Sequence, residues 1–429
     1  PFFKGLAEVR WDAPALVQWA KVALVHRGTI AGMYNSRLDG LTDYPFQRLS
    51  ALLADITPPA DVEPLAMSIG EPQHPAPDLI HEELARHATE WNKYPPTAGT
   101  KTYRRAVADW LTQRYSLPTD FIDPDKNTLP VAGTREALFM TGELVVPPEK
   151  NGQVPAVLMP NPFYQVYLGA AVMAGAEPVF VPATKDNGFI PDFQSLDGDV
   201  LNRTALAYLC SPANPQGSVA TLDQLKNAIA LARKHDFVLV GDECYSEIYS
   251  DTPPPGLIEA CADLGDGLGN VLVFNSLSKR SSAPGLRAGF VAGDPDLITK
   301  FQRLRSHAGA VQPLPVMAAA TALWRDEAHV EANRSLYRQK FDDAENIFGD
   351  HFGFSRPAGG FFQWLDVGDS CDATVKLWRD GGIKVLPGSY LSRPGTDGVS
   401  PGDQYIRVAL VHDRDATKTG LTRMFEILS

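Results

Sequence analysis

Short apolar runs alternate with amphipathic stretches through the middle of this sequence, and that alternation limits the folds open to the chain. Apolar runs with few polar breaks are typical of strands covered on both faces of a sheet. Stretches such as Glu136–Leu144, Tyr167–Ala174 and Leu222–His235 lie between them and are expected to be helices. Strands that alternate with helices form βαβ units around a mostly parallel sheet. The seven expected strands are Thr128–Ala132, Ala156–Met159, Pro178–Val181, Ala205–Cys210, Phe237–Gly241, Val271–Asn275 and Ala288–Val291.

The pattern changes after about Ala310, where a long helical stretch, Val316–Phe348, precedes a mixed segment. This change predicts a smaller α+β domain with strands at Phe361–Asp366, Ile383–Leu386 and Tyr405–Ala409. Pro1 is not a natural initiator residue, and we expect the natural start at Met33. The expected divisions are an N-terminal extension of uncertain origin (1–32), an arm with part of the small domain (33–75), a large domain (76–312) and a small C-terminal domain (313–429).

Charge and glycine spacing exclude several classes of function. The net charge is −12 and no basic block occurs, so neither nucleic acid nor an anionic membrane is an expected partner. A transcription regulator would need a DNA-binding module, for which the N-terminal extension is too short. No apolar stretch reaches the roughly 18 residues that span a bilayer. The glycine cluster at Gly265, Gly267 and Gly269 lacks the spacing of a dinucleotide-binding loop, which argues against a dehydrogenase.

The cysteine and histidine patterns predict free thiols and no metal site. The four cysteines are far apart and form no C-x-x-C pair, which is typical of a cytoplasmic protein in a reducing compartment. The nine histidines show no close ligand spacing.

Polar residues follow five of the expected strands at the point where each strand ends. Ligands of open parallel sheets bind outside the carboxyl ends of the strands. Polar groups from distant parts of the chain are therefore expected to converge on one edge of the sheet. The five polar segments are 133–135, 161–164, 211–215, 242–245 and 276–279.

Lys279 is the strongest candidate for covalent chemistry. It follows an apolar strand, and Ser276, Ser278 and Arg287 nearby could bind a phosphate. A lysine beside a phosphate-binding cluster suits a Schiff base to an aldehyde cofactor such as pyridoxal phosphate.

Asp242 is the candidate that would keep the ring nitrogen of such a cofactor protonated. It ends an apolar strand, and a charge-assisted hydrogen bond is worth about 1.5–3 kcal/mol. Asn214 and Tyr245 could donate hydrogen bonds to the ring oxygen. Pyridoxal phosphate acts as an electron sink only while its ring nitrogen carries a proton, so the acid is essential to the interpretation.

Each candidate also has an ordinary alternative when it is taken alone. A lysine at a strand end is often solvated, an aspartate there often caps a helix, and an asparagine before proline often forms a turn. Tyr164 could be a core aromatic, Gly133 a turn glycine, and Arg407 the partner of a surface acid. The ordered set favours the functional interpretation over these alternatives.

Three motifs together resemble those of class I pyridoxal-phosphate aminotransferases of fold type I. They are Ser276-Leu277-Ser278-Lys279 with Arg287, Asp242-x-x-Tyr245, and Asn214-Pro215-x-Gly217. The resemblance runs from about Met33 to the C-terminus. It implies an α/β fold with a mostly parallel seven-stranded sheet flanked by helices, a smaller α+β domain, and ping-pong transfer of an amino group between amino and keto acids.

The resemblance also implies roles for individual residues. Lys279 would hold the cofactor covalently and move the substrate proton, Asp242 would pair with the ring nitrogen, and Asn214 and Tyr245 would contact the ring oxygen. Ser276, Ser278, Arg287 and the backbone at Gly133, Thr134 and Arg135 would bind the phosphate, while Tyr164 would stack on the ring. Tyr94 would reach the phosphate of a neighbouring subunit, which implies a homodimer. Arg407 and Gly70, with Asn214, would bind the substrate.

Four local stretches are similar to the N-succinyldiaminopimelate aminotransferases of bacterial lysine synthesis: 242–249, 278–287, 324–330 and 386–391. This similarity implies glutamate as donor and N-succinyl-2-amino-6-oxopimelate as acceptor. Distal carboxylates of that substrate would need further contacts, for which Arg135, Arg280, Arg303, Arg305 and Gln312 are candidates. The alternatives are an aminotransferase for aspartate, alanine or aromatic amino acids, and a β-lyase acting on a cysteine thioether.

The proton-transfer role requires a lowered lysine pKa. An unperturbed lysine has a pKa of about 10.4, so only about one molecule in 10³ is neutral at pH 7. We expect burial and the positive charge of Arg287, Arg407 and Arg280 to lower the pKa of Lys279.

Overall fold

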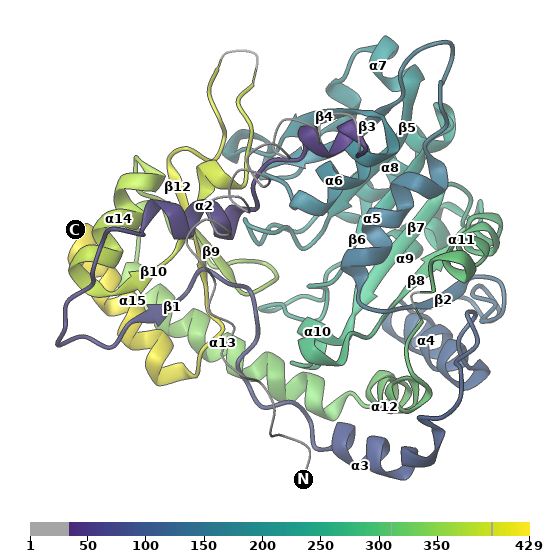
Figure 1. The fold of residues 1–429 in the computed structure, drawn as a ribbon, viewed down its shortest axis with the longest axis horizontal. Helices are drawn as coiled ribbons and strands as arrows, with labels where there is room; N and C mark the ends of the chain where they lie inside the picture. Colours follow the sequence, from purple (N-terminus) through teal and green to yellow (C-terminus); the bar gives the residue numbers. More distant parts are fainter. Residues whose placement is uncertain (1–33, 310, 396–397) are drawn as a thin grey trace, which may run out of the picture. The chain divides into compact units, whose positions relative to one another are not determined.

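Seven strands form the central sheet in the order β2-β8-β7-β6-β5-β3-β4 (Figure 1). The structure is a computed structural model that describes residues 34–309, 311–395 and 398–429. The expected extension and the Met33 start lie outside the described residues. The strands confirm all seven sequence predictions: β2 (Thr128–Val131), β3 (Ala156–Asn161), β4 (Glu177–Pro182), β5 (Thr204–Cys210), β6 (Val238–Asp242), β7 (Val271–Ser276) and β8 (Gly289–Gly293).

Only β8 runs against its neighbours in this sheet: it pairs antiparallel with both β2 and β7, and the other pairs are parallel. The register places Ser276 opposite Gly289 and Asp242 opposite Phe274. The carboxyl ends of β2, β3, β5, β6 and β7 consequently lie at one edge, as the sequence predicts.

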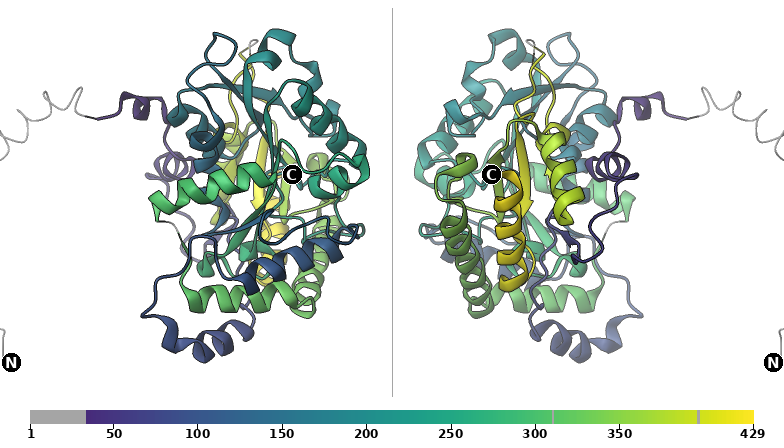
Figure 2. Two further views of the ribbon diagram at one scale, coloured as in Figure 1. Left: turned by 90° about the vertical axis from the view of Figure 1, so that its right-hand side faces the viewer. Right: turned by 90° about the vertical axis from the view of Figure 1, so that its left-hand side faces the viewer.

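Alternate side chains of the strands enter two separate cores because successive residues of a strand point to opposite faces. Leu239 and Val273 belong to one core, and Val240 and Leu272 belong to the other. Helices cover both faces (Figures 1 and 2). The first core contains residues from α4 (Lys101–Arg114), α8 (Leu222–Lys234), α9 (Leu257–Leu264) and α12 (Leu314–Arg325), and the second from α5 (Thr134–Val145), α6 (Gln165–Ala174) and α11 (Pro295–Ala308).

The C-terminal part has its own small sheets and core. The strands β9 (Phe362–Asp366), β11 (Leu386–Pro387) and β12 (Tyr405–Ala409) form an antiparallel sheet with β12 in the middle, and β1 (Leu65–Ala66) pairs with β10 (Ile383–Lys384). This core includes residues of α13 (Ala328–Phe348), α14 (Ser370–Gly381) and α15 (Arg414–Leu428). The expected α+β character is confirmed, and the domain boundaries stay a prediction.

The long helix expected at Val316–Phe348 is in fact two helices, α12 and α13. The chain is extended at Asp326, which separates them. The carboxylate of Asp326 accepts a 3.0 Å hydrogen bond from the backbone N–H of His329 and lies 2.5 Å from its Nδ1. The carboxylate thus satisfies an amide in the first turn of α13, where a helix has no internal partner to offer.

The remaining elements are short. The chain divides between Thr42 and Asp43 into two compact units, and the described part of the first unit contains η1 (Ser36–Gly40). The second unit also contains α2 (Pro45–Leu52), α3 (Leu79–Arg86), α7 (Gly198–Arg203), α10 (Leu277–Arg280), η2 (Ala88–Glu90), η3 (Lys185–Asn187), η4 (Phe193–Ser195), η5 (Pro284–Leu286), η6 (His351–Gly353) and η7 (Gly388–Tyr390). Within the described ranges, no helix has the length and apolar character needed to cross a membrane.

Candidate active site

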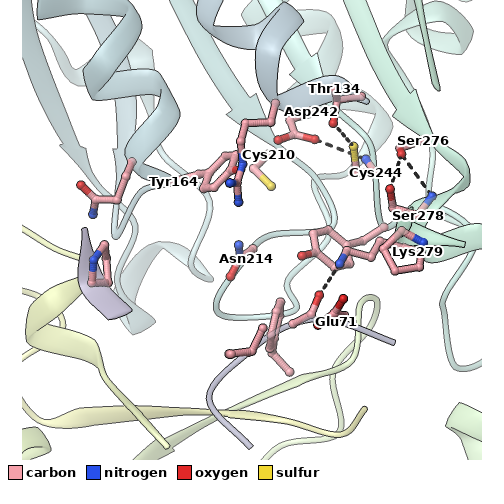
Figure 3. Close-up of a pocket in the computed structure, with 18 of the residues that line it drawn as sticks. Glu71, Thr134, Tyr164, Cys210, Asn214, Asp242, Cys244, Ser276, Ser278 and Lys279 are labelled. Carbon is pink, nitrogen blue, oxygen red and sulfur yellow. Dashed lines mark hydrogen bonds between the residues drawn. The ribbon is translucent and has the colours of Figure 1, made fainter. Parts of the chain in front are cut away.

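A cavity of about 710 Å³ opens at the carboxyl ends of the parallel strands. Its lining comes from segments that are far apart in the sequence, and Figure 3 shows side chains of Tyr164, Asn214, Asp242 and Lys279 around one open space. The sequence-predicted residues that line it are Gly70, Thr134, Arg135, Tyr164, Asn214, Asp242, Tyr245, Ser276, Ser278, Lys279, Arg287 and Arg407. The predicted convergence of polar groups is therefore observed.

Lys279 lies in α10, which begins directly after β7. Its Nζ donates a hydrogen bond to the carbonyl oxygen of Gly70, from a segment near the start of the second unit. Burial lowers the pKa of Lys279 to about 8, and the positive charges of Arg407 and Arg135 contribute to the decrease. The amine is therefore partly neutral near pH 7, as a proton-transfer group requires.

Arg280 does not line the cavity, and its expected effect on the pKa of Lys279 stays a prediction. Arg280 is buried, and its Nη1 donates a 2.7 Å hydrogen bond to the carbonyl oxygen of Leu323. Its Nη2 pairs with Glu327. The guanidinium is thus engaged with the α12–α13 junction and does not line the cavity. Arg287 lines the cavity, and its expected effect on this pKa also stays a prediction.

Asp242 ends β6 and is held by two donors. Tyr167 in α6 donates a 2.6 Å hydrogen bond to its Oδ2, and the backbone N–H of Cys244 donates a 3.4 Å hydrogen bond to Oδ1. Burial raises the pKa of Asp242, whereas these hydrogen bonds and the nearby Lys279 lower it. A buried carboxylate aimed into a cavity favours a cationic partner, such as a protonated ring nitrogen.

The first turn of α5 and the segment after β7 form an anion cradle. The amides of a helix's first turn have no partner within the helix and attract an anion. Ser276 Oγ lies 2.9 Å from Ser278 Oγ, and both hydroxyls line the cavity with Arg287. Hydroxyls, free amides and a guanidinium are the groups that bind a phosphate.

Gly133 does not line the cavity, yet it shapes this cradle. It precedes α5 with φ +80°, a conformation that favours glycine. A Cβ built at this position would lie 2.0 Å from Nη2 of Arg287. The glycine therefore lets the Arg287 guanidinium pack against the backbone at the start of α5.

Arg407 is buried in β12, opposite Trp364 of β9. Its Nη1 donates a 2.9 Å hydrogen bond to Oδ1 of Asn214, and its Nη2 donates a 2.7 Å hydrogen bond to the carbonyl oxygen of Ser68. Burial lowers its pKa to about 10, so the group stays cationic at pH 7. No carboxylate pairs with it in the described residues, and its buried Nε has no hydrogen-bond partner there. The surface-acid alternative is wrong, and the group is suited to a substrate carboxylate.

Tyr245 and Tyr164 enclose other sides of the cavity. Tyr245 is buried, and the Lys279 Nζ lies 6.0 Å from the centre of its ring. The Nε of Arg135 donates a 2.7 Å hydrogen bond to the hydroxyl of Tyr164. Tyr164 therefore lines the cavity with its hydroxyl hydrogen-bonded, which favours the functional interpretation over a plain core aromatic.

Several expected contacts are not brought to the cavity. Tyr94 is fully exposed, with a relative accessibility of 101%, and does not line the cavity. Of the candidates for distal substrate contacts, only Arg135 lines it. Arg305 pairs with Glu136, and Gln312 donates a hydrogen bond to the carbonyl oxygen of Arg287.

The structure adds lining residues that the sequence analysis missed, among them Tyr44, Glu71, Tyr167, Cys244 and Phe362. One feature of the sequence could have indicated Tyr167: it lies about one helical turn after Tyr164, which was a candidate. Cys244 lies within the Asp242-x-x-Tyr245 motif, and its Sγ is 3.2 Å from the Thr134 hydroxyl. Tyr44 and Phe362 come from segments without a recognisable motif.

The residues present fit pyridoxal phosphate: an amine for its aldehyde, an acid for its ring nitrogen and a cradle for its phosphate. No cluster of metal-ligating side chains occurs among the described residues. Fold and cavity together define a pyridoxal-phosphate-dependent enzyme of fold type I. The chain belongs to the aminotransferase class I and II family, whose model matches residues 62–423. It is a pyridoxal-phosphate-dependent aminotransferase that acts on amino and keto acids.

Relatives agree on this reaction class and differ in substrate. An aminotransferase structure from Neisseria meningitidis has a TM-score of 0.88 at 41% identity and covers 92% of this chain and 100% of that chain. The 4-dedimethylamino-4-oxo-anhydrotetracycline transaminase of Streptomyces rimosus is 34% identical over 80% of this chain and 88% of that protein. An LL-diaminopimelate aminotransferase of Syntrophobacter fumaroxidans is 30% identical over 90% of this chain and 97% of that protein.

Proposed function

We propose that this aminotransferase transfers an amino group between glutamate/2-oxoglutarate and N-succinyl-2-amino-6-oxopimelate, a step of lysine and diaminopimelate synthesis. The observation that carries the proposal is that two cations line the same cavity: Arg135 and buried Arg407, which pairs with no carboxylate of the described residues. The Arg135 guanidinium is available for a distal carboxylate. The four local stretches noted above and the relatives named for diaminopimelate support the same class of substrate.

LL-diaminopimelate itself is a second candidate. Several relatives carry its name, and Glu71 lines the cavity near Lys279. Free diaminopimelate has a distal ammonium group that a carboxylate can pair with, whereas the succinylated substrate has a neutral amide there. Glu71 and Arg135 together would suit a distal amino-acid group.

We assign the chemistry as follows. When bound, the cofactor supplies an aldehyde that takes up the amino group and a cationic ring that stabilises negative charge at the substrate α-carbon. Arg407 binds the substrate α-carboxylate through two parallel hydrogen bonds, and the backbone of Gly70 approaches the same carboxylate. The neutral Nζ of Lys279 removes the proton from the substrate α-carbon. It then delivers a proton to the carbon that carried the aldehyde of the cofactor.

The remaining residues hold the cofactor. Asp242 keeps the ring nitrogen protonated, Asn214 and Tyr245 donate to the ring oxygen, and Tyr164 stacks on the ring. The phosphate is bound by the cradle of Gly133, Thr134, Arg135, Ser276, Ser278 and Arg287. Ping-pong kinetics follow because one keto acid leaves before the next binds.

We further infer a homodimer that shares its active sites, with Tyr94 as the contribution to the neighbouring site, and a cytoplasmic location. The full exposure of Tyr94 supports the homodimer, and the four free cysteines support the cytoplasmic location. Light scattering of purified protein, and complementation between Tyr94→Phe and Lys279→Ala chains, test the shared site.

Steady-state kinetics test the substrate. N-Succinyl-LL-diaminopimelate, LL-diaminopimelate, aspartate, alanine and phenylalanine are each supplied with 2-oxoglutarate, and kcat/KM is compared. The proposal expects the succinylated compound to be preferred by at least about tenfold, or 1.4 kcal/mol. A preference for LL-diaminopimelate supports the second candidate, and a preference for the shorter amino acids contradicts both. Pyruvate and ammonia released from cystathionine without a keto acid would indicate a β-lyase.

A further inference from the structure

A continuous chain of polar contacts through buried Lys340, half-buried His74 and buried Asn333 connects α13 to the backbone of Lys279. Lys340 Nζ lies 2.7 Å from Nε2 of His74, and His74 Nδ1 lies 2.9 Å from Oδ1 of Asn333. Asn333 Nδ2 then donates to the carbonyl oxygens of Lys279 (3.2 Å) and Arg280 (3.3 Å). Lys340 and Asn333 are only 1% and 8% exposed, so water competes little for these contacts. None of the three side chains lines the cavity.

The contacts fix which atom carries each proton. The carbonyls of Lys279 and Arg280 can only accept, so the amide nitrogen of Asn333 must face them. The amide oxygen of Asn333 therefore faces His74, whose Nδ1 must carry the proton. Nε2 is left to accept a hydrogen bond from Lys340.

Lys340 also hydrogen-bonds to a third segment of the chain. Its Nζ also donates to the carbonyl oxygens of Leu410 (2.9 Å) and His412, just after the strand that carries Arg407. His74 in turn accepts a 2.8 Å hydrogen bond at its carbonyl oxygen from the hydroxyl of Ser282. The network thus touches the segments that contain Gly70, Lys279 and Arg407, all of which line the cavity.

We propose that Asn333, His74 and Lys340 form a positioning network that holds the Lys279 turn in place against the segments carrying Gly70 and Arg407. The inference rests on the role proposed for Lys279. The network acts through the backbone and touches neither substrate nor cofactor. Misplacing a proton-transfer group by a fraction of an ångström lowers kcat, because reacting atoms must be aligned.

The surroundings favour the neutral form of His74. Burial and the adjacent Lys340 lower the pKa of His74, while Asn333 and Asp413 raise it. Burial lowers the pKa of Lys340 to about 7, against the charge of Asp413. Tyr337 of α13 packs on both groups, with its ring centre 4.8 Å from that of His74 and 4.9 Å from the Lys340 Nζ. Protonated His74 cannot accept from Lys340, so acid disrupts the network.

Asn333→Leu tests the proposal, with Asn127→Leu as the matched control. Asn127 is also a buried asparagine, 7% exposed, that donates a 2.9 Å hydrogen bond to a backbone carbonyl, that of Gly293. In the holoenzyme we expect Asn333→Leu to lower kcat about tenfold, with KM for glutamate changed less than about threefold. We also expect hydrogen exchange of a peptide spanning 277–283 to accelerate about tenfold. Asn127→Leu should lower thermal stability without either effect.

Two replacements of His74 separate positioning from packing. His74→Asn can keep a donor near the Nδ1 position for Asn333, whereas His74→Gln places its amide near Nε2. We expect His74→Asn to retain kcat within about threefold and His74→Gln to resemble Asn333→Leu. The acid-side loss of kcat should also weaken in His74→Asn, because no ring is left to protonate.

Three outcomes would overturn the network. The first is an unchanged kcat in Asn333→Leu, and the second is a loss of kcat in Asn333→Leu equal to that in Asn127→Leu. The third is a lower kcat in His74→Asn than in His74→Gln. These outcomes leave the role of Lys279 standing, because that role is tested separately by the colour of Lys279→Ala.

Discussion

Tyr167 donates a 2.6 Å hydrogen bond to Oδ2 of Asp242, and both side chains are buried. A hydrogen bond to a charged group contributes about 1.5–3 kcal/mol and here favours the carboxylate form. Tyr167→Phe should therefore raise the pKa of Asp242 and disfavour the ionised carboxylate that pairs with the protonated ring nitrogen. We expect kcat to fall about tenfold, and the acid limb of the kcat–pH profile to shift to higher pH, because Asp242 must be ionised.

Tyr208→Phe is the control for this prediction. Tyr208 stacks on Tyr167 at 4.4 Å and donates a hydrogen bond of similar length, 2.7 Å, to the carbonyl oxygen of Leu138. Its loss should cost stability and leave the pH profile in place. Equal profiles for the two variants would show that the Tyr167 hydroxyl has no role in tuning Asp242.

Lys279→Ala should abolish transamination and the visible absorption of the covalently held cofactor, because alanine offers no amine to the aldehyde. Lys150→Ala is the control, since the Lys150 ammonium donates to the carbonyls of Thr204, His235 and Asp236, away from the cavity. Absorption spectra and a coupled glutamate assay provide the measurement. Retained colour and turnover in Lys279→Ala would remove this lysine from the mechanism.

Covalent uptake of pyridoxal phosphate by cofactor-free enzyme should depend on pH with a midpoint near 8. Only the neutral amine attacks an aldehyde, and burial lowers the pKa of Lys279 to about 8 from 10.5. The rate should rise about tenfold per pH unit below this midpoint and level off above it. Stopped-flow absorbance measures the rate, with N-acetyl-lysine as the unburied reference. A midpoint near 10.5 in the enzyme would contradict the lowered pKa.

Arg407→Lys should raise KM for glutamate and lower kcat/KM about 100-fold, or 2.7 kcal/mol. Lysine keeps the charge and loses the planar fork that binds a carboxylate with two hydrogen bonds. The control is Arg104→Lys, because Arg104 is also buried and donates to the backbone carbonyls of Ala98 and Gly99. Wild-type kcat/KM in Arg407→Lys would rule out a bidentate contact.

Gly133→Ala should weaken cofactor binding about tenfold. The new methyl group would occupy the space of the Arg287 guanidinium and displace it from the cradle. Gly152→Ala controls for backbone strain, because Gly152 has φ +72° and its Cβ would meet no atom within 4 Å. Fluorescence titration of cofactor-free protein gives both affinities, and equal values would assign the effect to strain alone.

The sequence predicts the sheet well because both faces of its strands are buried. Ala205–Cys210 is apolar throughout, and the observed β5 differs from it by one residue. The site is predictable for a related reason. Polar residues directly after such strands must lie at the same edge of the sheet, so Asp242 and Lys279 could be placed together without knowing any contact.

The sequence does not predict contacts that depend on how a helix is rotated or on which side chains pair. The break at Asp326 arises from a carboxylate that bonds His329, and no glycine or proline marks it. Arg280 follows Lys279 directly, yet it faces Glu327 and not the cavity. The Tyr167–Asp242 bond requires α6 to present one particular face to β6, which a mostly apolar helix does not encode in its spacing.

The order of the site residues along the chain has a consequence for synthesis of the enzyme. The lysine, the acid and every group of the cradle precede Leu314, whereas Arg407 follows it in β12. A nascent chain on the ribosome therefore completes its vitamin-binding groups well before it can recognise an amino acid. Premature termination before Tyr405 would leave a polypeptide without Arg407, the guanidinium proposed to bind the substrate carboxylate.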